Sequence, residues 1–564
     1  MKMAKKKQIA EIEKAYAEFE RVSKLYFSRI VNEPLETPEC LHININFACN
    51  LRCTICSISR KTMRDRKELT TAEIKNVIQQ GSAMGIKTLL LLGGEPFLRK
   101  DILQISDYAE NRGMHVSIIT NGTLIDKALA RKIIASKLEH LDFSIDGLEK
   151  GHDKIRGKGT FKKTLKAISI LEALIEKSGS KLTIGTNFTI TNSNVSEMMP
   201  AVRFFEKRYK KKNPVCFDIH FQPLVSNNAR PQKIEKSPEE LKPGNFRILD
   251  KNIAQLESYI RRHKNRGAQS IIKNQTLKHL EAIRAYFEGT LKPEESKCYA
   301  GFNRLMTTQR GQFYLCGTSF GDVRKQKLAD AWRSEEAKNA RKLIKKCRNP
   351  CVNFCQYLQN YEMTSNSFSD LAQNFLEEIM QKKSYSDEDK LKFISNAVHF
   401  ICEMKGLLNL KLANEKEVKE RRELADAVEE INQAEKMLYA AIKAAFKKIE
   451  KSFAEEESEN TRNKNKILQL SQELSQKDSE MHSLSEQSAA LCREKNSEIN
   501  LFRSQLTALS EENAGLKKEI SNMAQQSDRL QKEILEFRNS RGYRFILKPA
   551  DRAYKKMRRA INGR

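Results

Sequence analysis

The sequence predicts an α/β protein with a partial (β/α)6 barrel of the TIM type, a small α+β module after it, and a long α-helical coiled-coil C-terminal region. Three observations support this fold class. Between about residue 40 and residue 221, apolar alternating runs typical of strands take turns with amphipathic helical runs, which predicts a parallel sheet with helices outside. A second cysteine-bearing segment follows, and beyond Tyr361 the sequence becomes helical and then heptad-patterned.

We expect a helix within residues 1–38 that covers the first strand, and then the barrel over 39–229. The first strand is an alternating apolar run at 41–47. The other strands are expected at Thr88–Leu92, His115–Ile119, His140–Ile145, Leu182–Ile190 and Val215–Phe221. The helices between them are expected at Thr71–Ser82, Asp101–Arg112, Asp126–Ser136, Phe161–Lys177 and Val195–Lys207. Six strands make an incomplete barrel.

Three cysteines with the spacing C-x3-C-x2-C follow the first strand: Cys49, Cys53 and Cys56. Barrels of this type carry their chemistry at the carboxyl ends of the strands, which is where this loop begins. Three thiolates can hold three irons of a cubane [4Fe–4S] cluster and leave the fourth iron open. A zinc knuckle or three unrelated buried thiols are the alternatives.

Polar and glycine residues also follow the later strands. Gly93, Gly94 and Glu95 end the second strand, Ser144 lies at the end of the fourth, and Asn187 lies in the fifth. Glycines at such positions let the backbone approach another group closely. His152 and Asp153, just after the fourth strand, could form a general-base pair, but a structural role at a helix start is favoured.

Together these segments resemble the radical SAM superfamily. The resemblance implies that the open iron binds S-adenosylmethionine and that the reduced cluster cleaves it to a 5′-deoxyadenosyl radical, which abstracts hydrogen from a substrate. It also implies that Gly93, Gly94 and Glu95 hold the amino group of the methionyl part. Ser144, Asn187 and Arg156 would contact the ribose and carboxylate. An external electron donor of the flavodoxin or ferredoxin type is implied as well.

A helical insert is expected at 230–296, followed by a second cysteine module at 297–360 with Cys298, Cys316, Cys347, Cys351 and Cys355. The C-x12-G-x4-C spacing resembles the SPASM module of auxiliary clusters, or its shortened twitch form. Five cysteines can fully ligate only one cubane, so we expect a single auxiliary [4Fe–4S] cluster held by four of the five. Zinc is the alternative, because four thiolates suit it equally well.

The remaining chain is expected to be helical at 361–455 and a coiled coil at 456–538. Apolar residues there keep 3-4 spacing, and Asn513 occupies an a position, where a buried amide favours a two-stranded, in-register pair. We therefore expect a parallel homodimer. An intramolecular helical hairpin is the alternative.

The formal net charge of +29 calls for a polyanionic partner or surface. Residues 539–564 are strongly basic with an apolar helical face, which fits an anionic membrane surface bound through 541–564. Residues 540–549 also resemble tails that follow coiled coils in bacterial glycosyltransferases of surface-polysaccharide assembly. Nucleic acid is the competing partner, although no recognisable nucleic-acid-binding module accompanies the charge. A merely solvated basic end is the third option.

We expect a cytoplasmic enzyme, with the tail as a means of attachment to the inner face of the membrane. The twelve cysteines are too sparse for a disulfide scaffold, and neither an apolar signal core nor a membrane span is visible. The expected reaction is radical hydrogen abstraction from a peptide or protein, or from a sugar-type small molecule in envelope polysaccharide assembly. An RNA-modifying radical enzyme and a non-catalytic coiled-coil scaffold are the rival hypotheses.

Overall fold

The computed structural model describes residues 2–56, 67–209, 215–224, 243–263, 271–272, 276–292, 297–347, 367–382, 385–415 and 418–456. Its contacts divide the chain into two units, Met1–Ser471 and Gln472–Arg564, and the described residues all belong to the first. The expected coiled coil, apart from its first residue, and the basic tail lie outside the described residues.

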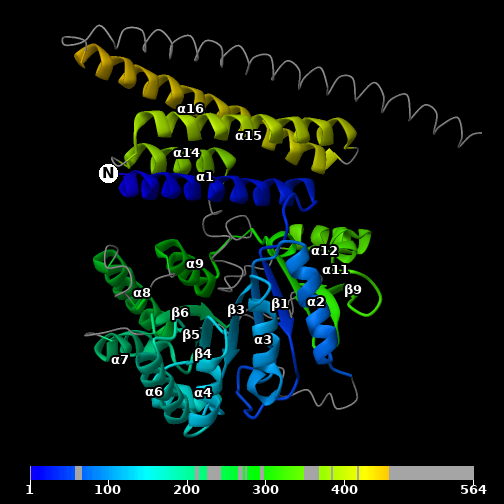
Figure 1. The fold of residues 1–564 in the computed structure, drawn as a ribbon, viewed down its shortest axis with the longest axis vertical. Helices are drawn as coiled ribbons and strands as arrows, with labels where there is room; N and C mark the ends of the chain where they lie inside the picture. Colours follow the sequence, from blue (N-terminus) through cyan, green and yellow to red (C-terminus); the bar gives the residue numbers. More distant parts are fainter. Residues whose placement is uncertain are drawn as a thin grey trace, which may run out of the picture. The chain divides into compact units, whose positions relative to one another are not determined.

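One nine-stranded sheet organises the barrel, in the order β6-β5-β4-β3-β2-β1-β7-β8-β9. Its first six strands in sequence pair in parallel, with helices between them, as the alternating pattern predicts (Figure 1). They are β1 Cys40–Asn44, β2 Thr88–Leu92, β3 His115–Thr120, β4 His140–Ser144, β5 Thr183–Ile190 and β6 Asp218–Pro223. The partial barrel is therefore confirmed.

Two of the crossover helices start at capping residues that the local sequence supplies. Thr70 and Glu73 form a reciprocal capping box at the start of α2, and the Asp126 side chain caps α4. The helices are α2 Thr71–Ala83, α3 Ile102–Glu110, α4 Lys127–Ala135, α5 Glu149–Arg156, α6 Thr160–Ser178 and α7 Met198–Tyr209, with short 3₁₀ turns η2 Pro96–Leu98 and η3 Val195–Glu197. Only α5 has no counterpart among the helices expected from the sequence.

The second cysteine module joins the same sheet. Strand β7, Arg304–Thr307, pairs in parallel with β1, and β8, Gln312–Leu315, and β9, Thr318–Asp322, continue it antiparallel. The module is thus continuous with the barrel through β1, which the sequence did not indicate. Its helices are α10 Ala300–Asn303, α11 Leu328–Arg333 and α12 Glu335–Lys345, and the insert supplies α8 Pro243–His263 and α9 Leu277–Glu288.

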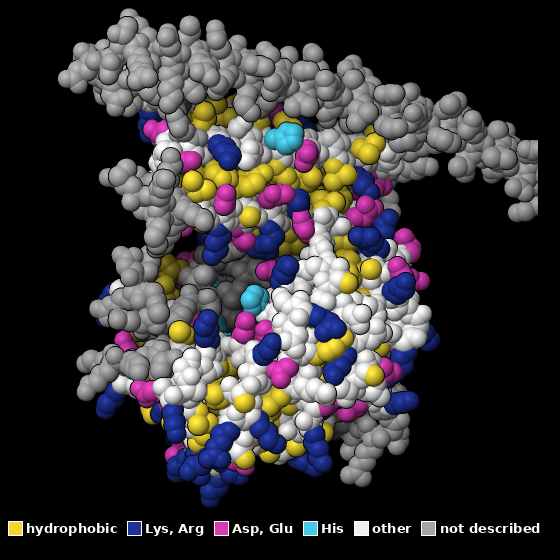
Figure 2. All heavy atoms as spheres, viewed as in Figure 1, with side chains coloured by type: hydrophobic (Ala, Val, Ile, Leu, Met, Phe, Trp, Pro, Cys, Tyr) yellow, Lys and Arg dark blue, Asp and Glu magenta, His cyan; other side chains and the backbone are white. Residues whose placement is uncertain are grey.

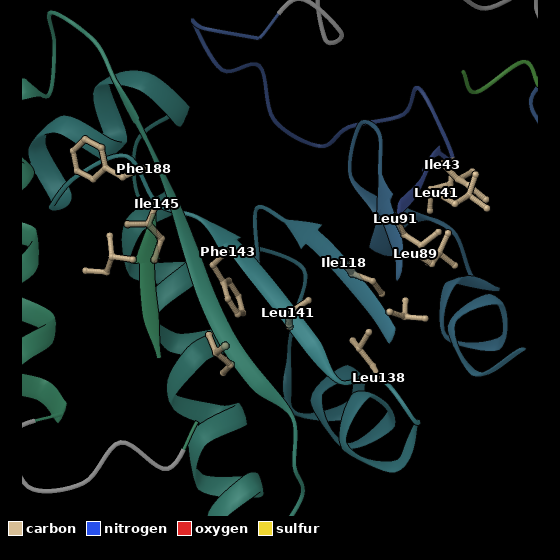
Figure 3. Packing of buried hydrophobic residues seen from close by; sticks show 14 of the residues in the cluster. Leu41, Ile43, Leu89, Leu91, Ile118, Leu138, Leu141, Phe143, Ile145 and Phe188 are labelled. Carbon is tan, nitrogen blue, oxygen red and sulfur yellow. The ribbon is translucent and has the colours of Figure 1, made fainter. Parts of the chain in front are cut away.

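The two faces of the sheet differ in character. Alternate side chains of successive strands, such as Leu89, Ile118 and Leu141, point into one apolar cluster under the crossover helices (Figure 3). Full burial of each such side chain stabilises the fold by about 1.5–3 kcal/mol. The opposite face is the inner wall of the barrel and carries buried polar residues, among them His42 and His220. The core therefore fixes the strands while leaving a polar interior.

The N-terminal helix belongs to a separate helical layer. Helix α1, Lys2–Val31, packs chiefly against α14, Phe368–Gln381, and α15, Asp387–Asn414, rather than over β1, and α16, Val418–Glu456, completes the layer (Figure 1). The Phe19 ring stacks on Phe375 with centroids 4.5 Å apart. The sequence analysis expected this helix to cover the first strand. It did not identify α14 and α15 as the partners of α1, because they lie more than 300 residues away in the sequence.

Basic side chains of the described part gather over α4 and α6 (Figure 2). No described helix combines the length and apolar character needed to cross a membrane.

Candidate active site

The cysteine loop leaves the carboxyl end of β1 and is held from several sides. The Thr54 N–H donates to the Ile155 carbonyl at the end of α5, at 2.8 Å, and the Phe47 N–H donates to the Glu68 carboxylate at 2.6 Å. The Cys56 N–H donates to the Cys53 carbonyl at 3.2 Å, which closes a turn between two of the thiols. The loop is therefore positioned by the barrel.

The three thiols lie close enough to affect one another. Burial raises the pKa of Cys49 and of Cys53, and the neighbouring thiols raise both values further. The Arg156 cation lowers them. Thiolates are the form that binds iron, so loading of this loop releases protons. The nearby guanidinium favours the ligating form.

The three thiols of the loop suit the ligation of a cubane cluster. Among the described residues, no three His, Cys, Asp or Glu side chains converge on one metal ion. In a cubane each thiolate binds its own iron, so the sulfur atoms need not converge on one point. Cys49, Cys53 and Cys56, on one short loop, satisfy that requirement.

Gly93 and Gly94 let the end of β2 approach the cysteine loop itself. A Cβ on Gly94 would lie 2.1 Å from the carbonyl oxygen of Ala48, and Gly93 has a φ of +154° with the Asn46 backbone beside it. The Gly94 and Glu95 N–H groups donate to the carbonyls of Asn46 and Ala48, at 3.0 and 2.7 Å. The glycines thus hold the loop, whatever they also contribute to a bound ligand.

Glu95 is buried, and its carboxylate faces the end of β3. It accepts hydrogen bonds from the Thr120 hydroxyl at 2.6 Å, the Asn121 N–H at 2.9 Å and the Phe97 N–H at 3.2 Å. Burial raises the pKa of Glu95, and these donors oppose the shift. In this arrangement Glu95 ties two strand ends together. Its expected contact with the methionyl amino group stays a prediction.

The turn after β3 reaches the cysteine loop through side chains. Asn121 Nδ2 donates to Asn50 Oδ1 at 2.9 Å, and Asn50 Nδ2 donates to the Thr123 hydroxyl at 2.8 Å. Asn50 lies between Cys49 and Cys53 in the sequence. The third strand end therefore supports the loop that carries the ligands.

Arg156 is paired with Asp146 beside the thiols. Arg156 Nε donates to Asp146 Oδ2 at 2.6 Å, and the Asp146 side chain has no exposed surface. Asp146 Oδ1 accepts from the Thr189 N–H at 2.9 Å, so both carboxylate oxygens are engaged. Burial is the largest single effect on the pKa of Arg156 and lowers it. Asp146 and the thiols together raise the pKa by more, so the net shift is upward. The guanidinium therefore stays charged next to the ligands.

Asp153 has the helix-start role that the sequence favours, whereas His152 lies within α5. His152 is buried, its Nδ1 accepts from the Asp146 N–H at 3.3 Å, and burial lowers its pKa to about 4. The Asp153 carboxylate accepts from the N–H groups of Gly159 and Phe161 at the start of α6. The two side chains are thus engaged with different neighbours.

Glu197 was missed by the sequence analysis. Its carboxylate accepts from the N–H groups of Leu148 and Gly151, at 2.7 and 2.9 Å, and so caps the start of α5. Helix α5 carries Arg156 and the Ile155 carbonyl that holds the loop. Only the fold brings Glu197 to that helix, so no local pattern could have revealed it.

Ser144 and Asn187 lie side by side on β4 and β5, where they are register partners. Both are partly exposed, and within the described part of the chain neither side chain has a hydrogen-bond partner. Their free polar groups at the carboxyl edge of the sheet suit contact with a polar ligand.

Three of the five auxiliary cysteines come together: Cys298, Cys316 and Cys347. Burial, then Cys298 and Cys347, raise the pKa of Cys316 to about 12. Cys316 and Gly317 have φ values of +44° and +81° and form the two-residue turn of the β8–β9 hairpin, which presents the thiol. Cys351 and Cys355 lie outside the described residues. Burial and mutual repulsion disfavour the thiolate forms of these cysteines. Bound iron would offset both effects.

Comparison with protein families agrees with this arrangement. A family described as the radical SAM superfamily matches residues 43–201, and a family described as an iron–sulfur cluster-binding domain, SPASM, matches residues 298–356. The first contains the cysteine loop and the strand ends, and the second contains all five later cysteines. An iron–sulfur group at the second cysteine set is thereby favoured over zinc.

Among curated proteins, the chain is 36% identical to Fe-coproporphyrin III synthase of Methanosarcina barkeri over 31% of this chain and 42% of that protein. It is 26% identical to the AdoMet-dependent heme synthase of the same organism over 56% of this chain and 85% of that protein. It is 35% identical to the mycofactocin maturase of Mycolicibacterium smegmatis over 24% and 35% of the two chains. The chain thus spans less than half of two of these three relatives.

Similar solved structures include Streptococcus suis SuiB bound to its precursor peptide SuiA, with 16% identity, a TM-score of 0.40, and coverage of 54% of this chain and 67% of that chain. Native anSMEcpe with bound AdoMet and a peptide has 17% identity, a TM-score of 0.41, and coverage of 59% and 96%.

Proposed function

We propose that this chain, a member of the radical SAM superfamily with a SPASM domain, cleaves S-adenosylmethionine reductively and abstracts a hydrogen atom from a peptide. The observation that carries the proposal is the thiol loop, fastened to the ends of β2, β3 and α5 with the Arg156–Asp146 pair beside it. When bound, the [4Fe–4S] cluster and S-adenosylmethionine supply a 5′-deoxyadenosyl radical that takes the hydrogen atom.

The chain's own residues have three tasks in this proposal. Cys49, Cys53 and Cys56 would ligate the catalytic cluster. Ser144 and Asn187 would donate or accept hydrogen bonds to the nucleoside, because neither side chain has a hydrogen-bond partner among the residues that the structure describes. Arg156 would place a positive charge beside the ligated sulfurs or beside the carboxylate of S-adenosylmethionine, and Asp146 holds it in position.

The names of two relatives support a peptide substrate. One is the mycofactocin maturase, and another, 29% identical over 29% of this chain and 43% of that protein, is the PqqA peptide cyclase of Granulibacter bethesdensis. These similarities cover 24% and 29% of this chain, so the substrate class is carried to this chain as a proposal.

A tetrapyrrole is the second candidate substrate. The heme synthase of Methanosarcina barkeri is matched over 85% of its own length, a wider span than either peptide-modifying relative shows. This favours a related substrate, because the match extends beyond the radical SAM domain. The sugar-type substrate and the envelope context expected from the tail are not favoured by any relative named above.

Iron and sulfide per chain after anaerobic reconstitution test the first part of the proposal. The wild type should hold about eight irons, and the Cys49/Cys53/Cys56→Ala variant about four, with loss of S-adenosylmethionine cleavage. Cleavage retained by the variant would overturn the assignment of the catalytic cluster. About four irons in the wild type and none in the variant would remove the auxiliary cluster instead.

A second assay separates the substrate candidates. Iron coproporphyrin III is added to the reduced, reconstituted enzyme, and formation of 5′-deoxyadenosine is followed. Faster formation that depends on the porphyrin, together with a shift of its absorbance on binding, would replace the peptide proposal by the tetrapyrrole one. Neither effect is expected if the substrate is a peptide.

We further propose that residues 456–538 form a parallel homodimer, that residues 541–564 bind an anionic membrane surface, and that a flavodoxin- or ferredoxin-like protein donates the electron. Sedimentation of the full chain tests the dimer. Flotation with vesicles of anionic and of neutral phospholipid, compared with RNA binding across salt concentrations, tests the partner of the tail.

A further inference from the structure

Arg304 is a buried cation on the inner face of the sheet. It begins β7, and the next residue, Leu305, belongs to the apolar cluster on the other face. His42 lies between Leu41 and Ile43, which point into the same cluster (Figure 3). Because side chains alternate along a strand, Arg304 and His42 both point to the inner face. There Arg304 Nη1 donates to His42 Nε2 at 2.6 Å.

His42 does not neutralise the charge of Arg304. Burial, and then the Arg304 cation, lower the pKa of His42 well below its ordinary value, so its imidazole is neutral near pH 7. A neutral imidazole accepts one hydrogen bond and supplies no negative charge. Among the residues that the structure describes, no carboxylate pairs with Arg304, and Asp142 of the inner face lies 3.2 Å from His140 instead. The guanidinium therefore has no counterion in the described chain.

One edge of the guanidinium is left without partners. Arg304 is 7% exposed, and its Nε is fully buried without a hydrogen bond. Its Nη2 makes no hydrogen bond to a described residue either, but keeps accessible surface. Nε and Nη2 together form an edge that can bind a carboxylate through two parallel hydrogen bonds. A buried cation with unused donors is costly unless an anion shares its site.

Arg341, in α12, shows how the same module satisfies another buried arginine. Its Nε and Nη2 donate to the carbonyls of Gly301 and Trp332, and its guanidinium lies 4.3 Å from the centroid of the Trp332 ring. Arg304 lacks both kinds of contact at the corresponding edge. The difference points to a ligand as the partner of Arg304.

The free edge lies at the end of the barrel remote from the cysteine loop. The parallel register places Arg304 opposite Cys40, the first residue of β1, and the loop follows the last residue, Asn44. The strand between them spans about 13 Å, at about 3.3 Å per residue. A ligand group held by Arg304 is therefore distant from the thiols.

We propose that Arg304 binds a carboxylate group of the substrate through its Nε and Nη2 N–H groups. The inference rests on the proposed function, whose two candidate substrates can both supply this group. A peptide carries it on an acidic side chain or at its carboxyl end, and an iron coproporphyrin carries it on its propionates. The bound anion supplies the missing counterion and orients the substrate by a part remote from the thiol loop.

The test compares ligands that have free carboxyl groups with the same ligands after methyl esterification. One arm uses a pool of random peptides and the other uses iron coproporphyrin III, each bound to the reconstituted full chain. In one arm the wild type should prefer the free acid by about tenfold or more, the effect of a charge-assisted hydrogen bond. Arg304→Gln should lose this preference. Arg333→Gln is the matched control and should keep it, because Arg333 is exposed at the end of α11 in the same module.

Equal binding of acid and ester by the wild type in both arms would overturn the proposal. A preference that survives in Arg304→Gln, or that is lost equally in Arg333→Gln, would overturn it as well. Iron content and urea unfolding show whether Arg304→Gln folds. If it does not, Arg304→Lys decides: a lowered preference supports the site, and an unchanged one refutes it.

Binding is measured without turnover, so the two proposals can fail separately. A wild type that prefers free carboxylates but does not cleave S-adenosylmethionine would refute the proposed reaction and leave the Arg304 site standing. Cleavage without any preference for the free acid would do the reverse.

Discussion

Arg156 and Asp146 form a buried ion pair within the same network that holds the cysteine loop. Arg156 Nε lies 2.6 Å from Asp146 Oδ2, and the side chains are 13% and 0% exposed. The pair joins the end of α5 to the segment after β4, and the neighbouring Ile155 carbonyl accepts from Thr54. Disruption of the pair should therefore affect both stability and the metal loop.

Asp146→Asn should lower the free energy of unfolding by about 3–5 kcal/mol, because it leaves a buried guanidinium without its counterion. Urea-induced unfolding measures this. The double variant with Arg156→Gln should recover part of the loss, since the stranded charge is removed. The exposed pair Lys162–Glu149 is the control, and Lys162→Gln there should have little effect. Equal losses of unfolding free energy in Asp146→Asn and Lys162→Gln would contradict the special cost of breaking the buried pair.

Gly94→Ala should prevent assembly of the catalytic cluster. The added Cβ would meet the Ala48 carbonyl oxygen at 2.1 Å, and both sides of this contact are backbone, so the cysteine loop must move. We expect the iron content to fall by about four per chain with loss of S-adenosylmethionine cleavage.

The control for Gly94→Ala is Gly244→Ala. Gly244 lies in α8, and a Cβ there would meet nothing within 4 Å. That variant should keep its iron and be as stable as the wild type or slightly more stable, because alanine suits a helix better than glycine. Normal iron content in Gly94→Ala would refute the close approach of the two segments.

Local sequence pattern was enough to predict the strands and most helices of the barrel. Thr88–Leu92 matches β2 at both ends, because a run of apolar residues between turn signals leaves little choice. The cysteine loop and the strand-end glycines were also found, since their spacing is local.

Long-range partners were not accessible in the same way. Glu197 caps α5, and Arg29 reaches Cys298 from an N-terminal helix. No pattern within a window of sequence reports such contacts, because they depend on which surfaces the fold brings together. The parallel pairing of β7 with β1 was missed for the same reason.

The buried imidazole of His152 should make stability depend on pH. Burial lowers the pKa of His152 to about 4, whereas the unfolded chain has a value of about 6.5. Below pH 6.5 the unfolded state therefore takes up a proton that the folded state refuses, so this contribution is lost as the pH falls toward 4. The loss amounts to about 3 kcal/mol over that window.

His152→Asn keeps a hydrogen-bond acceptor near the Asp146 N–H but does not titrate. Urea unfolding of both proteins at several pH values between 7 and 4.5 should show a shallower decline for the variant. Parallel curves for the two proteins would show that His152 is not responsible for the pH dependence.

Cys316→Ala should remove the auxiliary iron and spare the catalytic site. Cys316 is held at the tip of the β8–β9 hairpin beside Cys298 and Cys347, and a cubane cannot lose a ligand from such a set without weaker binding. Iron should fall from about eight to about four per chain, while reductive cleavage of S-adenosylmethionine continues. Cys402→Ala is the matched control, because Cys402 lies in α15 beside Glu435 and should leave the iron content unchanged. If Cys316→Ala keeps all its iron, the three described cysteines do not share a cluster.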